Sequence, residues 1–201
     1  MKTTLSEDGL GFTLKFFSNL MNEKCEYFLF FGTLLGLVRD KRPIKGDDDV
    51  DFYVNKNHYA FVKDMLSGLG IPINYGEWPN NTEDFIQANC VIEGIEVRAD
   101  FYFYDNETDI NFVKEKWNFL GKPENPSNIL KVPKPLIFPL KKITWQDATL
   151  YIPMHPEIIC EMLYGINWNI PQQKGVDYVM HVHGGRPLRM VQRGKEISLL
   201  P

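Results

Sequence analysis

The stretch GDDDVDFYV, residues 46–54, places four aspartates within five positions, directly ahead of an apolar run. Successive side chains of a strand point to opposite faces, so Asp49 and Asp51 share one face, about 7 Å apart along the chain. Asp47 joins them if the strand extends back that far, whereas Val50 faces a core on the other side. The pattern therefore predicts a strand with an acidic face and an apolar face.

This acidic face predicts a metal site. Strands disfavour aspartate, and carboxylate oxygens are the ligands that hard divalent cations prefer. Asp100 lies within the apolar run Ile95–Tyr104, where an acid is costly unless it is paired or bound to metal. We expect Asp49, Asp51 and Asp100 to hold two Mg²⁺ ions, or Mn²⁺ in their place, for displacement at phosphorus. A solvated acidic turn or a calcium loop is the alternative, although the spacing does not match an EF-hand.

A glycine turn precedes the acidic strand. Gly32 and Thr33 follow the aromatic run Tyr27–Phe31, which predicts a buried strand, and precede a short helix over Leu34–Arg39. Glycine lets the backbone approach a phosphate, and a helix N-terminus offers amide groups to it. Arg39, at the end of this helix, can hold phosphate oxygens with two hydrogen bonds.

The remaining pattern predicts an α+β or α/β core with a mixed sheet. The proline- and asparagine-rich segment Lys122–Pro139 is expected to be irregular and to separate the core from a C-terminal lobe. The other expected elements are helices over Ser6–Lys24, His58–Leu69 and Pro156–Tyr164, a strand over Ile71–Tyr75, and hairpins over Phe85–Tyr104 and Ile143–Ile152.

Composition limits the classes of function. A length of 201 residues fits one domain, and a net charge of −4 argues against a nucleic-acid binder held by a basic field. Cys25, Cys90 and Cys160 are scattered, which predicts buried thiols rather than disulfides or zinc ligands. His181 and His183 lack further ligands for zinc, so contact with a glycan or with phosphates is favoured. Without a signal-peptide core or a spanning apolar run, we expect a cytoplasmic protein with no transmembrane segment, in which peripheral membrane contact is left open.

The string FGTLLGLVRDKRPIKGDDDVDFYV, residues 31–54, resembles the LicD family, which is related to fukutin and has a nucleotidyltransferase fold. That family shows a G-T-L-L-G-x-x-R segment followed by D-D-D-x-D. The segment Phe138–Pro171 is similar to the C-terminal half of the family, so the resemblance spans Tyr27–Pro171. Gly46 stands where tryptophan is usual, and Asn167 stands where an acid is common.

The resemblance implies one nucleotidyltransferase-like domain over residues 1–201, a mixed sheet flanked by helices, with a core of about 6–121 and a lobe of about 122–201. It implies transfer of a phosphorylated alcohol, such as phosphocholine or ribitol phosphate, from a CDP-linked donor such as CDP-choline. The acceptor is a hydroxyl of a cell-surface glycan or glycolipid, of lipopolysaccharide or capsule type, and CMP leaves.

The resemblance also implies residue roles. Asp49 and Asp51 would bind the metal ions, and Asp100 would bind metal and accept the proton of the attacking hydroxyl. The donor phosphates and head group would be bound by Gly32, Thr33, Arg39, Asp47 and Asp48. Two alternatives remain: a nucleotidyltransferase that moves a nucleoside monophosphate from an NTP to a small molecule or protein, and a non-catalytic glycan- or nucleotide-binding module.

Overall fold

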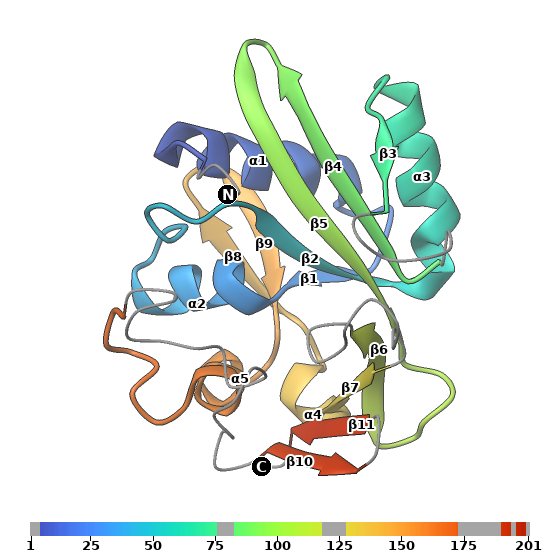
Figure 1. The fold of residues 1–201 in the computed structure, drawn as a ribbon, viewed down its shortest axis with the longest axis vertical. Coiled ribbons are helices and arrows are strands. Elements are labelled where there is room, and N and C mark those ends of the chain that lie inside the picture. The colour runs from blue at the N-terminus through green and yellow to red at the C-terminus, as the bar shows by residue number, and fades with distance from the viewer. Residues whose placement is uncertain (1–4, 76–82, 118–127, 173–189, 194–195, 200–201) are drawn as a thin grey trace.

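A computed structural model describes residues 5–75, 83–117, 128–172, 190–193 and 196–199 (Figure 1). Its α+β fold is a curled mixed sheet flanked by helices, as the sequence predicts. The helices are α1 (Glu7–Met21), α2 (Phe31–Arg39), α3 (Tyr59–Gly68), α4 (Lys134–Ile137) and α5 (Pro156–Tyr164). The strands are β1 (Tyr27–Leu29), β2 (Val50–Asn55), β3 (Ile73–Asn74), β4 (Phe85–Ile92), β5 (Ile95–Asp105), β6 (Phe112–Trp117), β7 (Asn128–Pro133), β8 (Lys141–Trp145), β9 (Ala148–Ile152), β10 (Met190–Arg193) and β11 (Glu196–Leu199).

The sheet brings together acids that lie far apart in the sequence. Its main path runs β1-β2-β5-β6-β7-β11-β10, while β4 pairs with β5 and β3 pairs with β4. Strands β2 and β5 are parallel, in a register that pairs Asp51 with Asp100. The β4–β5 hairpin turns at Glu93 and Gly94, as expected, and both residues have positive φ. A separate two-stranded sheet is formed by β8 and β9.

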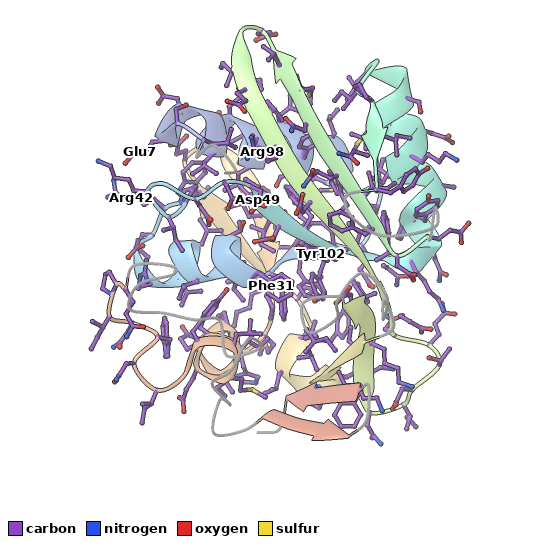
Figure 2. All side chains as sticks on the ribbon, in the orientation of Figure 1. Glu7, Phe31, Arg42, Asp49, Arg98 and Tyr102 are labelled. Carbon is purple, nitrogen blue, oxygen red and sulfur yellow. The ribbon has the colours of Figure 1, made fainter. Side chains whose placement is uncertain are left out.

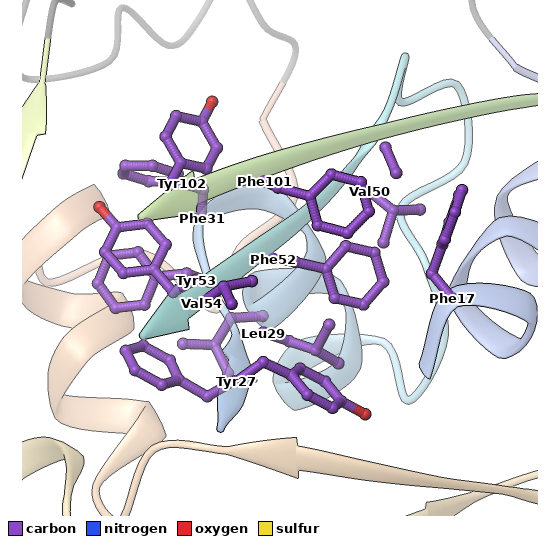
Figure 3. Close-up of a cluster of buried hydrophobic side chains, with 14 of the residues drawn as sticks. Phe17, Tyr27, Leu29, Phe31, Val50, Phe52, Tyr53, Val54, Phe101 and Tyr102 are labelled. Carbon is purple, nitrogen blue, oxygen red and sulfur yellow. The ribbon is translucent and has the colours of Figure 1, made fainter. Parts of the chain in front are cut away.

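Helix α1 packs against one face of the β2–β5 pair. Helix α1 begins at its N-cap Ser6, whose hydroxyl oxygen accepts a hydrogen bond from the Gly9 amide at 3.0 Å. Its apolar stripe includes Phe17, whose ring meets Phe101 at 5.3 Å and Phe52 at 6.3 Å (Figure 3). Burying three aromatic rings on this face fixes β2 and β5, and the residues that alternate with them must face the other way.

The boundary between β1 and α2 differs from the one that the sequence predicts. The aromatic run ends as a strand at Leu29, and α2 begins at Phe31 rather than Leu34. Phe31 has a φ of 42°, so the chain turns there while its ring is buried against Tyr53 and Tyr102. An apolar run indicates burial, but it does not show where a buried strand turns into a buried helix.

The segment Lys122–Pro139, expected to be irregular, contains β7 and α4. Strand β7 pairs with β6, a strand that the sequence pattern did not predict. A proline lies in the first turn of α4. Proline suits the first turn of a helix, so its presence there did not exclude one. The division of the chain near residue 122 stays a prediction, and His181 and His183 lie outside the described residues.

Within the described part of the chain, no helix combines the length and the apolar character that crossing a membrane requires.

Candidate active site

Acidic side chains gather where the start of β2 meets the N-terminus of α2. Asp51 and Asp100 are paired across β2 and β5 and are 6% and 5% exposed. Gln87 of β4, opposite Asp100 in the register, donates its amide Nε2–H to Asp100 Oδ1 at 2.7 Å. Asp49 directly precedes β2 and lies beside this face of the sheet (Figure 2). Asp100 is therefore held in a fixed orientation, next to Asp51.

The charge at Asp51 is electrostatically costly. Burial raises the pKa of its carboxyl well above the usual value, and the negative charges of Asp49, Asp47 and Asp100 raise it further. A hydrogen bond from the Thr33 backbone acts in the opposite direction. A site that crowds carboxylates and keeps them from water favours a bound cation, because a cation reverses the direction of these effects.

Thr33 joins the start of α2 to β2. Its side-chain oxygen accepts a hydrogen bond from the Asp51 amide at 2.8 Å, and its own amide points at Asp51 Oδ2 at 3.5 Å. The Phe30 amide donates to the Asp51 carbonyl at 3.3 Å. Thr33 is 3% exposed, and its hydroxyl oxygen contacts β2 through the hydrogen bond from the Asp51 amide. Its expected role at the donor phosphates stays a prediction.

Gly32 lies where any side chain would meet the acids. A Cβ at this position would be 2.7 Å from Asp47 Oδ2 and 3.7 Å from Asp51 Oδ2. The preceding residue, Phe31, has a left-handed backbone that is sparsely populated for non-glycine residues and costs about 1–3 kcal/mol. The tight approach between the helix end and the carboxylates is thus built into the backbone of this turn.

The aspartates of the loop before β2 suit a divalent ion. Among the described residues, carboxylate oxygens of Asp47, Asp48 and Asp49 lie within 4.8 Å of one another, and all three side chains are half-buried. Such hard oxygen donors fit Mg²⁺ or Mn²⁺. Asp47 and Asp48 were expected to contact the donor head group. Their positions make them candidate metal ligands beside Asp49.

Arg98 is a site residue that the sequence analysis did not select. The residue is 6% exposed, and its guanidinium donates from Nη1 to the Asp48 carbonyl at 3.1 Å and from Nη2 to Glu96 Oε1 at 3.0 Å (Figure 2). It lies two positions before Asp100 on β5, so both side chains share a face. The alternation of side chains along β5 is the feature of the sequence that places Arg98 on the face of Asp100. Arg98 anchors the aspartate loop and supplies a cation next to it.

In the structure Arg39 pairs with its neighbour Asp40 and not with the aspartates of the site. Its Nε and Nη2 donate to the two carboxylate oxygens of Asp40 at 2.8 and 2.7 Å, and this pairing raises the pKa of the guanidinium while burial lowers it. Arg39 ends α2, about 10 Å along the helix axis from Gly32 at the usual rise. Its expected contact with donor phosphates stays a prediction.

Buried aromatic side chains lie next to the acids on the same face of β2 and β5. Tyr53 and Tyr102 are buried at 5.5 Å from each other, and the Tyr53 hydroxyl donates to Glu115 Oε2 at 3.1 Å. Burial raises the pKa of both phenols, and the nearby charge of Asp51 adds to this effect. Electrostatic interactions are stronger next to such buried apolar groups than in water.

A mixed sheet on which strand acids meet the N-terminus of a short helix is the architecture of a nucleotidyltransferase-type domain. The family model described as "LicD/FKTN/FKRP, nucleotidyltransferase domain" matches residues 24–155, about two-thirds of the chain. The chain belongs to this family, and so to the transferases.

Two further comparisons add little. A crystal structure of the lincosamide antibiotic adenylyltransferase LnuA, bound to lincomycin, matches with a TM-score of 0.48 and 15% identity. The match covers 75% of this chain and 81% of that chain. No curated protein matches the sequence.

Proposed function

We propose that the protein is a metal-dependent phosphotransferase that moves a phosphorylated alcohol, such as phosphocholine, from a CDP-linked donor to a hydroxyl of a cell-surface glycan or glycolipid. Membership of the LicD/FKTN/FKRP family supports the reaction class. The observation that carries the proposal is the pairing of Asp51 with Asp100 at the N-terminus of α2.

Each part of the site has a role in this reaction. The amides at the start of α2 bind a donor phosphate, because a helix N-terminus carries partial positive charge, and Gly32 lets the phosphate approach. Asp49, Asp51 and Asp100, with the neighbouring loop acids, would hold two Mg²⁺ ions, or Mn²⁺. When bound, the ions would supply positive charge for the attacking and leaving oxygens. Asp100, oriented by Gln87, accepts the proton of the acceptor hydroxyl.

The second candidate is a nucleotidyltransferase that moves a nucleoside monophosphate from an NTP. The observation in its favour is that the matching family model describes a nucleotidyltransferase domain. The same acids would serve, and the leaving group would be pyrophosphate instead of CMP.

The two reactions are separated by their donors. The purified protein would be screened by thermal shift with CDP-choline, CDP-ribitol, CDP-glycerol and NTPs, each with and without Mg²⁺, because a ligand of the native state raises the unfolding temperature. Release of CMP from a CDP-alcohol when a glycan acceptor is supplied supports the first reaction. Release of pyrophosphate from an NTP when a small-molecule or protein acceptor is supplied supports the second. The Asp51→Asn variant is the matched control and should lose either activity. A protein that binds a donor but releases neither product with any of the acceptors supplied supports the non-catalytic module.

A further inference from the structure

A hollow lies along α1, away from the acids. Its volume is about 600 Å³, and it lies between α1, the loop at Arg42 and Pro43, and the ends of the β4–β5 and β8–β9 hairpins. None of the site acids, residues 47–49, 51 and 100, lines it. Figure 2 shows Glu7 and Arg42, two of its lining residues, apart from Asp49. The volume falls in the range of about 300–1,000 Å³ that is usual for small-molecule sites.

Aromatic rings form the apolar part of this hollow. Phe12 and Phe16, one turn apart on α1, are half-buried and stacked at 5.5 Å with an interplanar angle of 17°. Trp145, at the end of β8, is held by a hydrogen bond of 3.1 Å from its indole N–H to the Lys41 carbonyl. A Cβ on Gly11 would lie 3.2 Å from the Trp145 ring, so the glycine allows the indole to approach α1. The ring faces are thus fixed in place.

The polar part of the hollow has no net charge. Glu7 and Asp8 contribute two acids, Lys15 and Arg42 contribute two cations, and Gln146 adds an amide. The charges are partly matched already, since Glu7 lies 3.9 Å from Arg42 and Lys15 pairs with Asp147. A phosphate or polyanion would need an excess of cations here, and an apolar ligand would leave these polar groups without water. Fixed ring faces beside donors and acceptors of both signs suit a neutral ligand rich in hydroxyl groups.

We propose that this hollow, formed by α1, Arg42 and Trp145, binds a neutral oligosaccharide. This inference rests on the proposed function: the bound sugars are the part of the acceptor glycan that is remote from the attacking hydroxyl. Aromatic faces stack on the apolar faces of sugar rings, while the carboxylates, cations and amide exchange hydrogen bonds with their hydroxyl groups.

The hollow and the acidic site share the loop between α2 and β2. Arg42 lines the hollow, and the Trp145 indole is bonded to the carbonyl of the preceding residue. The same loop continues to Asp47, whose amide donates to the Ile44 carbonyl at 3.1 Å and whose carbonyl accepts from the Leu5 amide at 3.1 Å. A glycan in the hollow therefore touches the loop that carries the aspartates, and can extend from there toward the acids.

The test measures binding without chemistry. The full chain is applied to a printed array of neutral and anionic oligosaccharides, and the neutral sugar with the strongest signal is titrated by calorimetry. Trp145→Ala removes a stacking face, and Asn19→Trp fills the hollow from an exposed position of α1 without cutting into the core. We expect each change to weaken binding at least tenfold. Trp168→Ala, a tryptophan deletion outside the hollow, should leave binding unchanged.

Several results would overturn the proposal. These are the absence of binding to any neutral sugar, binding of anionic sugars alone, and unchanged binding in both hollow variants. A dimer that Asn19→Trp dissociates, measured by light scattering, would instead make the hollow a contact between copies. Binding should persist in Asp51→Asn and without Mg²⁺. Failure of the hollow thus shows as lost binding, and failure of the proposed function as lost transfer with binding intact.

Discussion

Two glycines of α2 provide a matched test of the site. A Cβ added at Gly32 would lie 2.7 Å from Asp47 Oδ2, the end of a side chain, whereas one added at Gly36 would lie 2.7 Å from the Arg42 carbonyl and 2.9 Å from the Ile44 amide. A carboxylate can rotate away, but the backbone of the loop cannot. Gly32→Ala should therefore damage function, and Gly36→Ala should damage stability.

The expected magnitudes follow from these contacts. Alanine gains about 1 kcal/mol over glycine inside a helix. At Gly32 this gain is offset by about 0.5–1.5 kcal/mol for moving the Asp47 side chain off its rotamer, so the stability stays within about 1 kcal/mol of wild type. At Gly36 overpacking costs up to about 3 kcal/mol, which leaves a loss of about 2 kcal/mol. For a chain of this size that loss lowers Tm by about 4–8 °C.

The assay combines urea unfolding with ligand-dependent thermal shift. A donor and Mg²⁺ at 100 times Kd stabilise the wild type by about 2.7 kcal/mol. Tenfold weaker binding removes about 1.4 kcal/mol of this stabilisation, and we expect Gly32→Ala to lose at least that much. Gly36→Ala should keep the ligand-induced increment at temperatures where it is folded. The reasoning is refuted if Gly32→Ala unfolds more easily by over 2 kcal/mol, or if it keeps full affinity for donor and metal.

Further changes test the surroundings of the acids. Arg98→Met should destabilise the protein in urea by about 1.5–3 kcal/mol, because it removes a charged hydrogen bond to the aspartate loop, and Arg98→Lys should recover part of the loss. Thr33→Val leaves the buried Asp51 amide without its acceptor and should cost about 1–3 kcal/mol, while Thr33→Ser should stay near wild type. Asp51→Asn should stabilise the protein in EDTA at neutral pH and abolish its stabilisation by Mg²⁺; a variant that still responds to Mg²⁺ would remove Asp51 from the site. Burial raises the pKa of Glu115 above its ordinary 4.5, so its contribution to stability is complete below that pH and is lost as pH rises toward the folded-state value. Glu115→Gln should therefore match wild type at low pH and exceed it increasingly at higher pH in urea titrations, and parallel pH profiles would contradict this.

The sequence predicted the strand that carries Asp51 because alternation is a local property, but β2 begins at Val50, so Asp47, Asp48 and Asp49 lie in the loop before it. Strand geometry alone predicts that the side chains of Asp51 and Val50 point to opposite faces of β2. The glycine turn at residues 93–94 predicts the β4–β5 hairpin. The pairing of Asp51 with Asp100 is different. It depends on β2 and β5 lying parallel and in one register, which no local pattern determines.

Other features were hidden because they depend on distant partners. β7 exists by pairing with β6, and α2 begins early because the Phe31 ring is buried among aromatic side chains of β2 and β5. The position of Arg98 could have been found by applying strand alternation to β5 as well as β2. Its contact with the Asp48 carbonyl could not, since the aspartate loop has no regular structure.

The hydrogen bond from the Leu5 amide to the Asp47 carbonyl has a practical consequence. Leu5 is buried, 42 positions before the aspartate with which it pairs, so the segment just ahead of α1 helps to support the aspartate loop. A purification tag or fusion partner attached ahead of this segment is therefore expected to affect the aspartate loop. Mg²⁺ binding should be measured after the tag has been cleaved.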